Sequence, residues 1–196
     1  MNINICGVGG QGVLFASKTL ASAFLLEDRP VLCAETHGMS QRGGFLLTHL
    51  RTDEDAVAPL VPDRSCDLMV SLELLEPMRQ TALLSKESRV VVNDLRIVPL
   101  PVTLRLAEYP SRGDIIECLG RYTKHLEVVD FNAAALRLGG PILANVVALG
   151  YLADGLPVET KNIKKSITEG SPERFAATNI AAFEAGMEIR RGTAEP

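Results

Sequence analysis

Residues 2–12 read Asn2-Ile3-Asn4-Ile5-Cys6-Gly7-Val8-Gly9-Gly10-Gln11-Gly12. The apolar start is typical of a short buried strand, and the glycines that follow satisfy the spacing G-x-G-x-x-G. Residues 13–26 then have helical spacing with an Ala-rich apolar face, and residues 30–35 form a second apolar run. The order strand, glycine turn, helix and strand predicts a β-α-β unit with a right-handed crossover.

The rest of the chain repeats this alternation of strands and helices. Ser111 is a candidate N-cap, with Asp114 in the capping-box position. Further strands are expected at residues 45–51, 66–71, 89–93 and 126–129, and helices at 72–84, 111–122, 132–138, 142–153, 159–169 and 173–188. We therefore predict an α/β fold, a three-layer Rossmann-like domain with a mainly parallel sheet and a C-terminal helical segment. Residues 1–190 should form one domain, and residues 191–196 a disordered tail.

Composition excludes several classes of protein. The formal net charge is −4, whereas a nucleic-acid-binding surface is usually basic. No stretch reaches the roughly 18 to 20 apolar residues of a membrane helix, and the N-terminus lacks the pattern of a signal peptide, so a cytoplasmic protein is expected. The four cysteines, at positions 6, 33, 66 and 118, form no C-x-x-C pair. We therefore predict no metal site on this chain.

The glycine loop is the first candidate binding site. Glycines allow a tight turn and close approach of a ligand, and a helix N-terminus offers free N–H groups to a phosphate. The candidate cofactor-binding residues here are Gly7, Gly9, Gly10, Gln11 and Gly12. Because Glu35 lies about where a dinucleotide fold places its ribose-binding acid, an NAD- or FAD-binding domain is one interpretation. Against it, no helix is expected directly after residue 35; a purely structural role for the glycines is a third interpretation.

A second polar segment, residues 36–44, follows the second expected strand. Four of its side chains are candidates for contact with a ligand or a partner protein: His37, Ser40, Gln41 and Arg42. Arg42 suits a phosphate or a carboxylate, and His37 can donate or accept a hydrogen bond near neutral pH. Both loops should leave the carboxyl edge of one sheet, where open α/β sheets bind ligands, so we expect them to converge. No nucleophile elbow is present, and we assign no catalytic residue to this chain.

Together, the glycine motif of residues 7–13 and the Glu35-Thr36-His37-Gly38-Met39-Ser40-Gln41-Arg42-Gly43-Gly44 motif resemble a known pair. The pair is that of the small, non-cluster (beta or gamma) subunits of 2-oxoacid:ferredoxin oxidoreductases. The second motif is most similar to that of the indolepyruvate ferredoxin oxidoreductase beta subunit. The likeness continues through residues 66–73 and the Asn93-Asp94 pair.

This resemblance implies an oxidoreductase that is active only together with a large subunit. That partner would carry thiamine diphosphate and the [4Fe–4S] clusters, and the complex would convert an arylpyruvate, coenzyme A and oxidised ferredoxin into an acyl-CoA, carbon dioxide and reduced ferredoxin. Coenzyme A is the ligand implied for the glycine loop. Two other hypotheses remain: a free-standing NAD(P)- or FAD-binding oxidoreductase, and a coenzyme A- or nucleotide-binding regulatory module. The sequence is compatible with either a monomer or a homodimer of the isolated chain.

Overall fold

The computed structural model describes residues 1–37 and 44–194, apart from the His37 and Ala194 side chains. In chain order its elements are β1 (Asn2–Val8), α1 (Val13–Leu25), β2 (Leu32–His37), β3 (Phe45–Arg51), β4 (Leu68–Ser71), the 3₁₀ helix η1 (Glu76–Leu83), β5 (Arg89–Asn93), α2 (Leu100–Thr103), α3 (Arg112–Gly120), β6 (His125–Val129), α4 (Phe131–Arg137), the 3₁₀ helix η2 (Pro141–Leu143), α5 (Ala144–Leu152), the 3₁₀ helix η3 (Ala153–Gly155), α6 (Thr160–Gly170) and α7 (Glu173–Ala194).

One six-stranded sheet runs through the domain in the order β2-β3-β1-β4-β5-β6. β3 is antiparallel to both of its neighbours, whereas β1, β4, β5 and β6 are parallel to one another. The mainly parallel sheet that the sequence predicts is therefore confirmed. Val8 at the end of β1 lies opposite Phe45 at the start of β3, and His37 at the end of β2 lies opposite Leu46. The ends of β1 and β2 thus lie at the same edge of the sheet.

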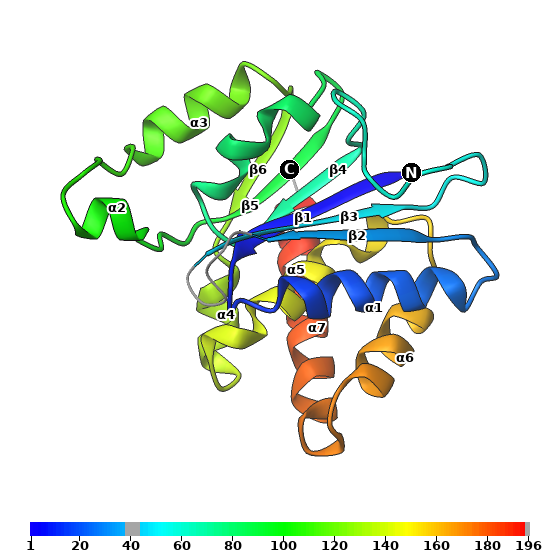
Figure 1. The fold of residues 1–196 in the computed structure, drawn as a ribbon. Coiled ribbons are helices and arrows are strands. Elements are labelled where there is room, and N and C mark those ends of the chain that lie inside the picture. Colours follow the sequence, from blue (N-terminus) through cyan, green and yellow to red (C-terminus); the bar gives the residue numbers. More distant parts are fainter. Residues whose placement is uncertain (38–43, 195–196) are drawn as a thin grey trace.

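Helices cover both faces of the sheet, which makes three layers (Figure 1). On one face lie α1 and α4–α7, and on the other η1 and α3. Alternation along the strands supplies both cores: in β5, Val91 packs in the core with α1 and α5, and Val90 and Val92 pack in the core with α3. The three-layer α/β prediction is confirmed.

The C-terminal helices α5 and α7 pack closely against each other. Every residue of α5 is buried, because α7 crosses it at close range. A Cβ atom built on Gly150 would lie 1.9 Å from the carbonyl oxygen of Phe183, and one on Gly186 would lie 2.0 Å from that of Val147. Only glycine allows two helix backbones to approach this closely. We expected the ordered domain to end at residue 190, but α7 continues through Ala194.

Two expected elements differ from the structure. Residues 72–84 were expected to form an α-helix, whereas a 3₁₀ helix covers only Glu76–Leu83. Its start is set by Glu73, whose carboxylate accepts hydrogen bonds from the backbone N–H groups of Leu75 (2.6 Å) and Glu76 (3.0 Å). β2 extends past Glu35 to His37. The Ser111–Asp114 capping box of α3 is present as expected.

Candidate functional site

The glycine loop joins β1 to α1 through two residues in left-handed conformations. Gly10 has a φ of 103° and Gly12 a φ of 80°, which side chains disfavour. Gly12 is the N-cap of α1 and offers no side chain to cap the helix. The first-turn N–H groups of α1 have no acceptor within the helix, and they carry the positive end of its dipole. The turn therefore has the geometry of an anion-binding site.

Gln11 holds the loop in place rather than projecting from it. Its side-chain Oε1 accepts a hydrogen bond from the Val8 N–H (2.7 Å), and its Nε2 donates to the carbonyl oxygen of Leu72 (2.6 Å). The side chain thereby ties the loop to the segment that follows β4. Both functional ends of the amide are engaged, so Gln11 contributes rigidity to the predicted site.

The other predicted glycines divide into two groups. Gly7 is buried, and a Cβ atom there would lie 2.9 Å from Gln11 Oε1 and 3.0 Å from Val13 Cγ2. Its role is therefore to let α1 pack on β1. Gly9, Gly10 and Gly12 instead line an open cavity of about 440 Å³, which we call the glycine cavity.

The glycine cavity is also lined by residues from the second motif. Glu35 on β2 and Gly44 before β3 both contribute to its wall. The Gly9 N–H donates to the Gly44 carbonyl oxygen at 2.8 Å, so the end of the second motif is hydrogen-bonded to the glycine loop. The expected convergence of the two segments is confirmed for the residues that the structure describes. Ser40, Gln41 and Arg42 lie outside those residues, as does the His37 side chain, and their roles stay predictions.

The strand order bears on the dinucleotide interpretation. In a dinucleotide-binding fold the second strand lies directly beside the first. Here the antiparallel β3 separates β2 from β1, so Glu35 lies two strands away from the glycine loop. The arrangement disfavours the interpretation of Glu35 as a ribose-binding acid.

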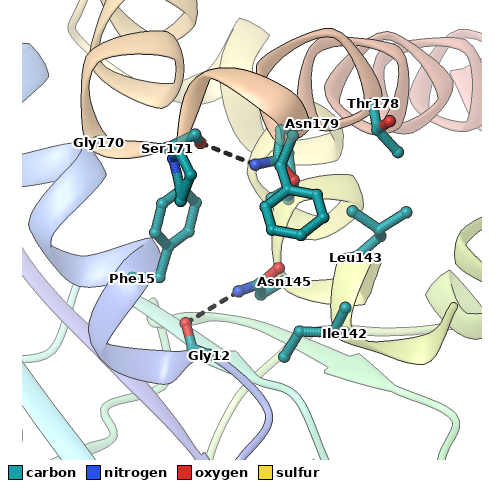
Figure 2. A pocket seen from close by; sticks show the side chains of 12 residues that line it. Gly12, Phe15, Ile142, Leu143, Asn145, Gly170, Ser171, Thr178 and Asn179 are labelled. Atoms are coloured by element: carbon teal, nitrogen blue, oxygen red, sulfur yellow. Dashed lines mark hydrogen bonds between the residues drawn. The ribbon is translucent and has the colours of Figure 1, made fainter.

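Sequence reasoning missed Asn145, which comes from the far end of the chain. Its Nδ2 donates to the carbonyl oxygen of Gly12 at 3.0 Å (Figure 2), and the residue is 3% exposed. A Cβ atom on Gly12 would lie 2.0 Å from this nitrogen. The available signal was a polar amide within the apolar run that became α5, since a buried polar group needs a partner. The apolar sequence around Asn145 gave no indication of which group its amide would bond to.

The similarity to known proteins extends over nearly the whole chain. The family profile described as pyruvate ferredoxin/flavodoxin oxidoreductase matches residues 2–189. The chain belongs to this family. It is 35% identical over 188 residues to the indolepyruvate oxidoreductase subunit IorB of Archaeoglobus fulgidus, covering 95% of this chain and 93% of that subunit. It is 33% identical to the subunit of the same name from Methanothermobacter thermautotrophicus, covering 95% of each chain.

Two solved structures have the same fold as this chain. The gamma subunit of a keto/oxoacid ferredoxin oxidoreductase from Geobacter sulfurreducens superposes with a TM-score of 0.68 at 21% identity, covering 97% of this chain and 98% of that one. A 2-oxoglutarate:ferredoxin oxidoreductase chain from Magnetococcus marinus superposes with a TM-score of 0.73 at 16% identity, covering 98% of this chain and 31% of that one. The fold thus occurs both as a separate subunit and as part of a longer polypeptide.

The residues of this chain do not fit an iron–sulfur cluster. Cys6 and Cys66 are buried, Cys33 is exposed to solvent, and Cys118 is partly buried. In residues 1–37 and 44–194, no three His, Cys, Asp or Glu side chains gather as a metal site requires. Burial raises the pKa of Cys6 and of Cys66 to about 12, so both thiols are protonated at neutral pH in this structure. Within the same residues, no helix is long and apolar enough to cross a membrane.

Proposed function

We propose that this chain is the small subunit of a 2-oxoacid:ferredoxin oxidoreductase that acts on an arylpyruvate such as indolepyruvate. The observation that carries the proposal is the full-length similarity to subunits named for indolepyruvate oxidoreductase, at 35% and 33% identity. The complex would decarboxylate the 2-oxoacid oxidatively, transfer its acyl group to coenzyme A and pass the electrons to ferredoxin. Thiamine diphosphate and the iron–sulfur clusters would be supplied by a large partner subunit.

The role of this chain in that reaction is to bind coenzyme A at the glycine loop. The diphosphate would lie against the free N–H groups at the start of α1, and the lack of side chains at Gly9, Gly10 and Gly12 lets it approach the backbone. None of the described residues that line the glycine cavity is Lys or Arg. The attraction from these residues therefore comes from backbone amides and the helix dipole, and Glu35 opposes it.

The subunit assignment is tested by reconstitution. The chain is co-expressed with the thiamine-binding, iron–sulfur subunit of its own host, and the complex is assayed for coenzyme A-dependent reduction of a viologen dye by indolepyruvate. We expect activity from the complex and none from either chain alone. If the two chains fail to co-purify, or if the large subunit is fully active alone, the assignment is wrong.

The glycine-loop assignment is tested by a matched pair of substitutions at Leu14. This residue is partly exposed, lines the glycine cavity and lies in the first turn of α1. Leu14→Glu places a negative charge beside the bound phosphates, whereas Leu14→Gln has nearly the same shape without the charge. An acid in the first turn of a helix is favourable to the helix, so Leu14→Glu should stay folded. We expect the KM for coenzyme A to be about tenfold higher in Leu14→Glu than in Leu14→Gln; equal values would remove the loop from the coenzyme A site.

The free-standing dinucleotide enzyme is tested with the isolated chain. Calorimetric titration with NAD, NADP and FAD should show no micromolar binding, since the sheet does not have the strand order of a dinucleotide-binding fold. Tight binding of any of the three would favour the dinucleotide interpretation over ours.

A further inference from the structure

A long connection leaves the sheet between β5 and α3. It contains the one-turn helix α2, which Figure 1 shows projecting beyond the edge of the sheet. Both ends of the connection are held by one buried carboxylate: Glu73 Oε1 accepts from the Ile97 N–H at 3.0 Å and from the Tyr109 hydroxyl at 2.5 Å. We call the chain between these two anchors, residues 98–108, the arm. Its base is therefore fixed to the sheet, whereas its tip extends away from it.

Large apolar side chains of the arm face solvent. Their exposed fractions are 45% for Val98, 67% for Leu100, 58% for Leu104 and 77% for Leu106. In the part of the chain that the structure describes, neither core of the sheet includes a residue of the arm. Residues 97–104 also contain no charged side chain, whereas an exposed connection is normally polar unless it has a function. Packing within this chain therefore does not account for the apolar composition of the arm.

The backbone of the arm is nevertheless well defined. Pro99 and Pro101 restrict φ at the start of α2. The Leu106 N–H closes the other end of the helix by donating to the carbonyl oxygen of Pro101 at 2.8 Å, and Arg105 between them adopts a left-handed φ of 58°. A segment that is already shaped in this way loses less conformational entropy when a partner binds it.

The exposed apolar surface of the arm is large for a single segment. Val98, Leu100, Leu104 and Leu106 together expose roughly 450 Å², which is comparable with the largest apolar patch of a typical monomer. This is about half of the ~800 Å² that each partner buries in an interface of standard size. Two arms from two copies of this chain would therefore fall short of a stable dimer by themselves. The partner that fits is one that covers the arm together with a neighbouring part of the molecule.

The neighbouring part is the carboxyl edge of the sheet, which carries the glycine loop. β1, β4 and β5 are adjacent and parallel, so the segments that follow Val8 and Asn93 leave the sheet at the same edge. Only β4 lies between these two strands, which places the starts of the two segments about 10 Å apart. In the proposed reaction, coenzyme A held at the glycine loop must meet the acyl group on the thiamine of the large subunit. That subunit must therefore approach the edge from which the arm extends.

We propose that the arm is a docking surface for the large, thiamine-binding subunit, whose apolar side chains cover Leu100, Leu104 and Leu106 while that subunit covers the carboxyl edge. This inference rests on the proposed function, of which it identifies the interface. Charged residues are depleted at the centres of protein interfaces, as they are in residues 97–104. A lysine placed in such a contact loses its hydration without gaining a partner, so it should weaken the association strongly.

Leu104→Lys and Leu60→Lys form a matched pair of variants for the test. Leu104 is 58% exposed and Leu60 is 56% exposed, but Leu60 belongs to the connection from β3 to β4, which begins and ends at the opposite edge of the sheet. Neither residue belongs to a core, so both variants should fold and melt as the unmodified chain does. The dissociation constant for the large subunit of the same host, measured by calorimetry, should rise about tenfold or more in Leu104→Lys and stay within about twofold in Leu60→Lys.

Amide hydrogen exchange tests the same contact without any substitution. A single helical turn opens readily in the free chain, so its amides should exchange quickly there. In the complex with the large subunit, we expect residues 100–106 to exchange about tenfold more slowly or less, because the partner covers them. Residues 53–58, in the connection from β3 to β4, should keep the rates that they have in the free chain.

Three results would overturn the inference. The first is a Leu104→Lys variant that binds the large subunit as tightly as the unmodified chain, and the second is unchanged exchange of residues 100–106 in the complex. The third is a Leu104→Lys variant that loses self-association of the isolated chain while it still binds the large subunit, since the arm would then bind a second copy. An active complex with an unprotected arm contradicts only the docking surface, whereas unmodified chains that do not associate contradict the proposed function itself.

Discussion

The side-chain amide of Asn145 donates to the carbonyl oxygen of Gly12 across 3.0 Å, which joins the start of α5 to the start of α1. The two residues are 133 positions apart in the chain. Through this bond the glycine loop is fixed both by its own strand and by the C-terminal helices. The loop's conformation therefore depends on how α1 and α5 pack on their face of the sheet, where the two helices share one core.

The first prediction concerns Gly12. We expect Gly12→Ala to lower the free energy of unfolding by about 2 kcal/mol or more, because the φ of 80° strains a side chain and the new Cβ would lie 2.0 Å from Asn145 Nδ2. Gly10→Ala separates the two causes. Its φ is 103°, but nothing lies within 4 Å of the new Cβ, so it should lose only about 1 kcal/mol. Urea unfolding of both variants measures the difference; equal losses would mean that the Asn145 contact is not tight.

The second prediction concerns the crossing of α5 and α7. Gly150→Ala should cost about 3 kcal/mol or more, since its Cβ would lie 1.9 Å from a backbone oxygen of Phe183, and one helix must move to make room. Gly120→Ala at the end of α3 is the control, because nothing lies within 4 Å of its Cβ. There, alanine should be neutral or stabilise by up to about 1 kcal/mol. The midpoint temperatures of thermal unfolding of the two variants should therefore shift in opposite directions, or by very unequal amounts.

The third prediction concerns the segment before α3. The buried Glu73 carboxylate accepts from the Tyr109 hydroxyl at 2.5 Å and from the Ile97 N–H at 3.0 Å, so it anchors this segment to the sheet. Burial, and then the bond to Glu73, raise the pKa of the Tyr109 phenol. Tyr109→Phe should cost about 1.5–3 kcal/mol and speed amide hydrogen exchange at Ile97. Tyr122→Phe, at a residue 41% exposed, should do neither; an unchanged exchange rate at Ile97 in Tyr109→Phe would show that the anchor lies elsewhere.

Features that depend on residues close together in the sequence were predicted correctly. The Ser111–Asp114 capping box and the glycines of the first turn were both expected and both found, because each depends on residues a few positions apart. The start of the helix at Glu76 was not expected, since it depends on the Glu73 carboxylate, which accepts from the first N–H groups; nothing in the local pattern of residues 72–84 predicted its 3₁₀ form.

Long-range geometry was beyond the reach of the sequence pattern. The insertion of β3 between β2 and β1 depends on strand pairing, which no local motif encodes, and it places the strand that carries Glu35 two positions from β1. Asn145 was likewise missed, because its partner at Gly12 is brought near only by the packing of α5. The predictable part of the site is therefore the backbone turn, and the unpredicted part is the side chain that supports it.

The last prediction concerns pH and His49, which is 5% exposed on β3. Its Nδ1 accepts hydrogen bonds from Asn4 Nδ2 (3.0 Å) and from the Val61 N–H (3.1 Å), so a proton on that nitrogen would face two donors. Burial also lowers the pKa of His49 below its ordinary value of 6.5. Below pH 6.5 the unfolded chain therefore takes up a proton that the folded chain does not, and stability is lost as the pH falls.

The loss should approach about 1.4 kcal/mol per pH unit from this residue until the lowered pKa is reached. It is measured as the free energy of unfolding in urea between about pH 5 and pH 7. His49→Gln should flatten the slope below pH 6.5, even if it lowers stability at every pH. The same slope in His49→Gln as in the unmodified chain would mean that His49 is free to take up a proton in the folded state, and that its two donors can reorient.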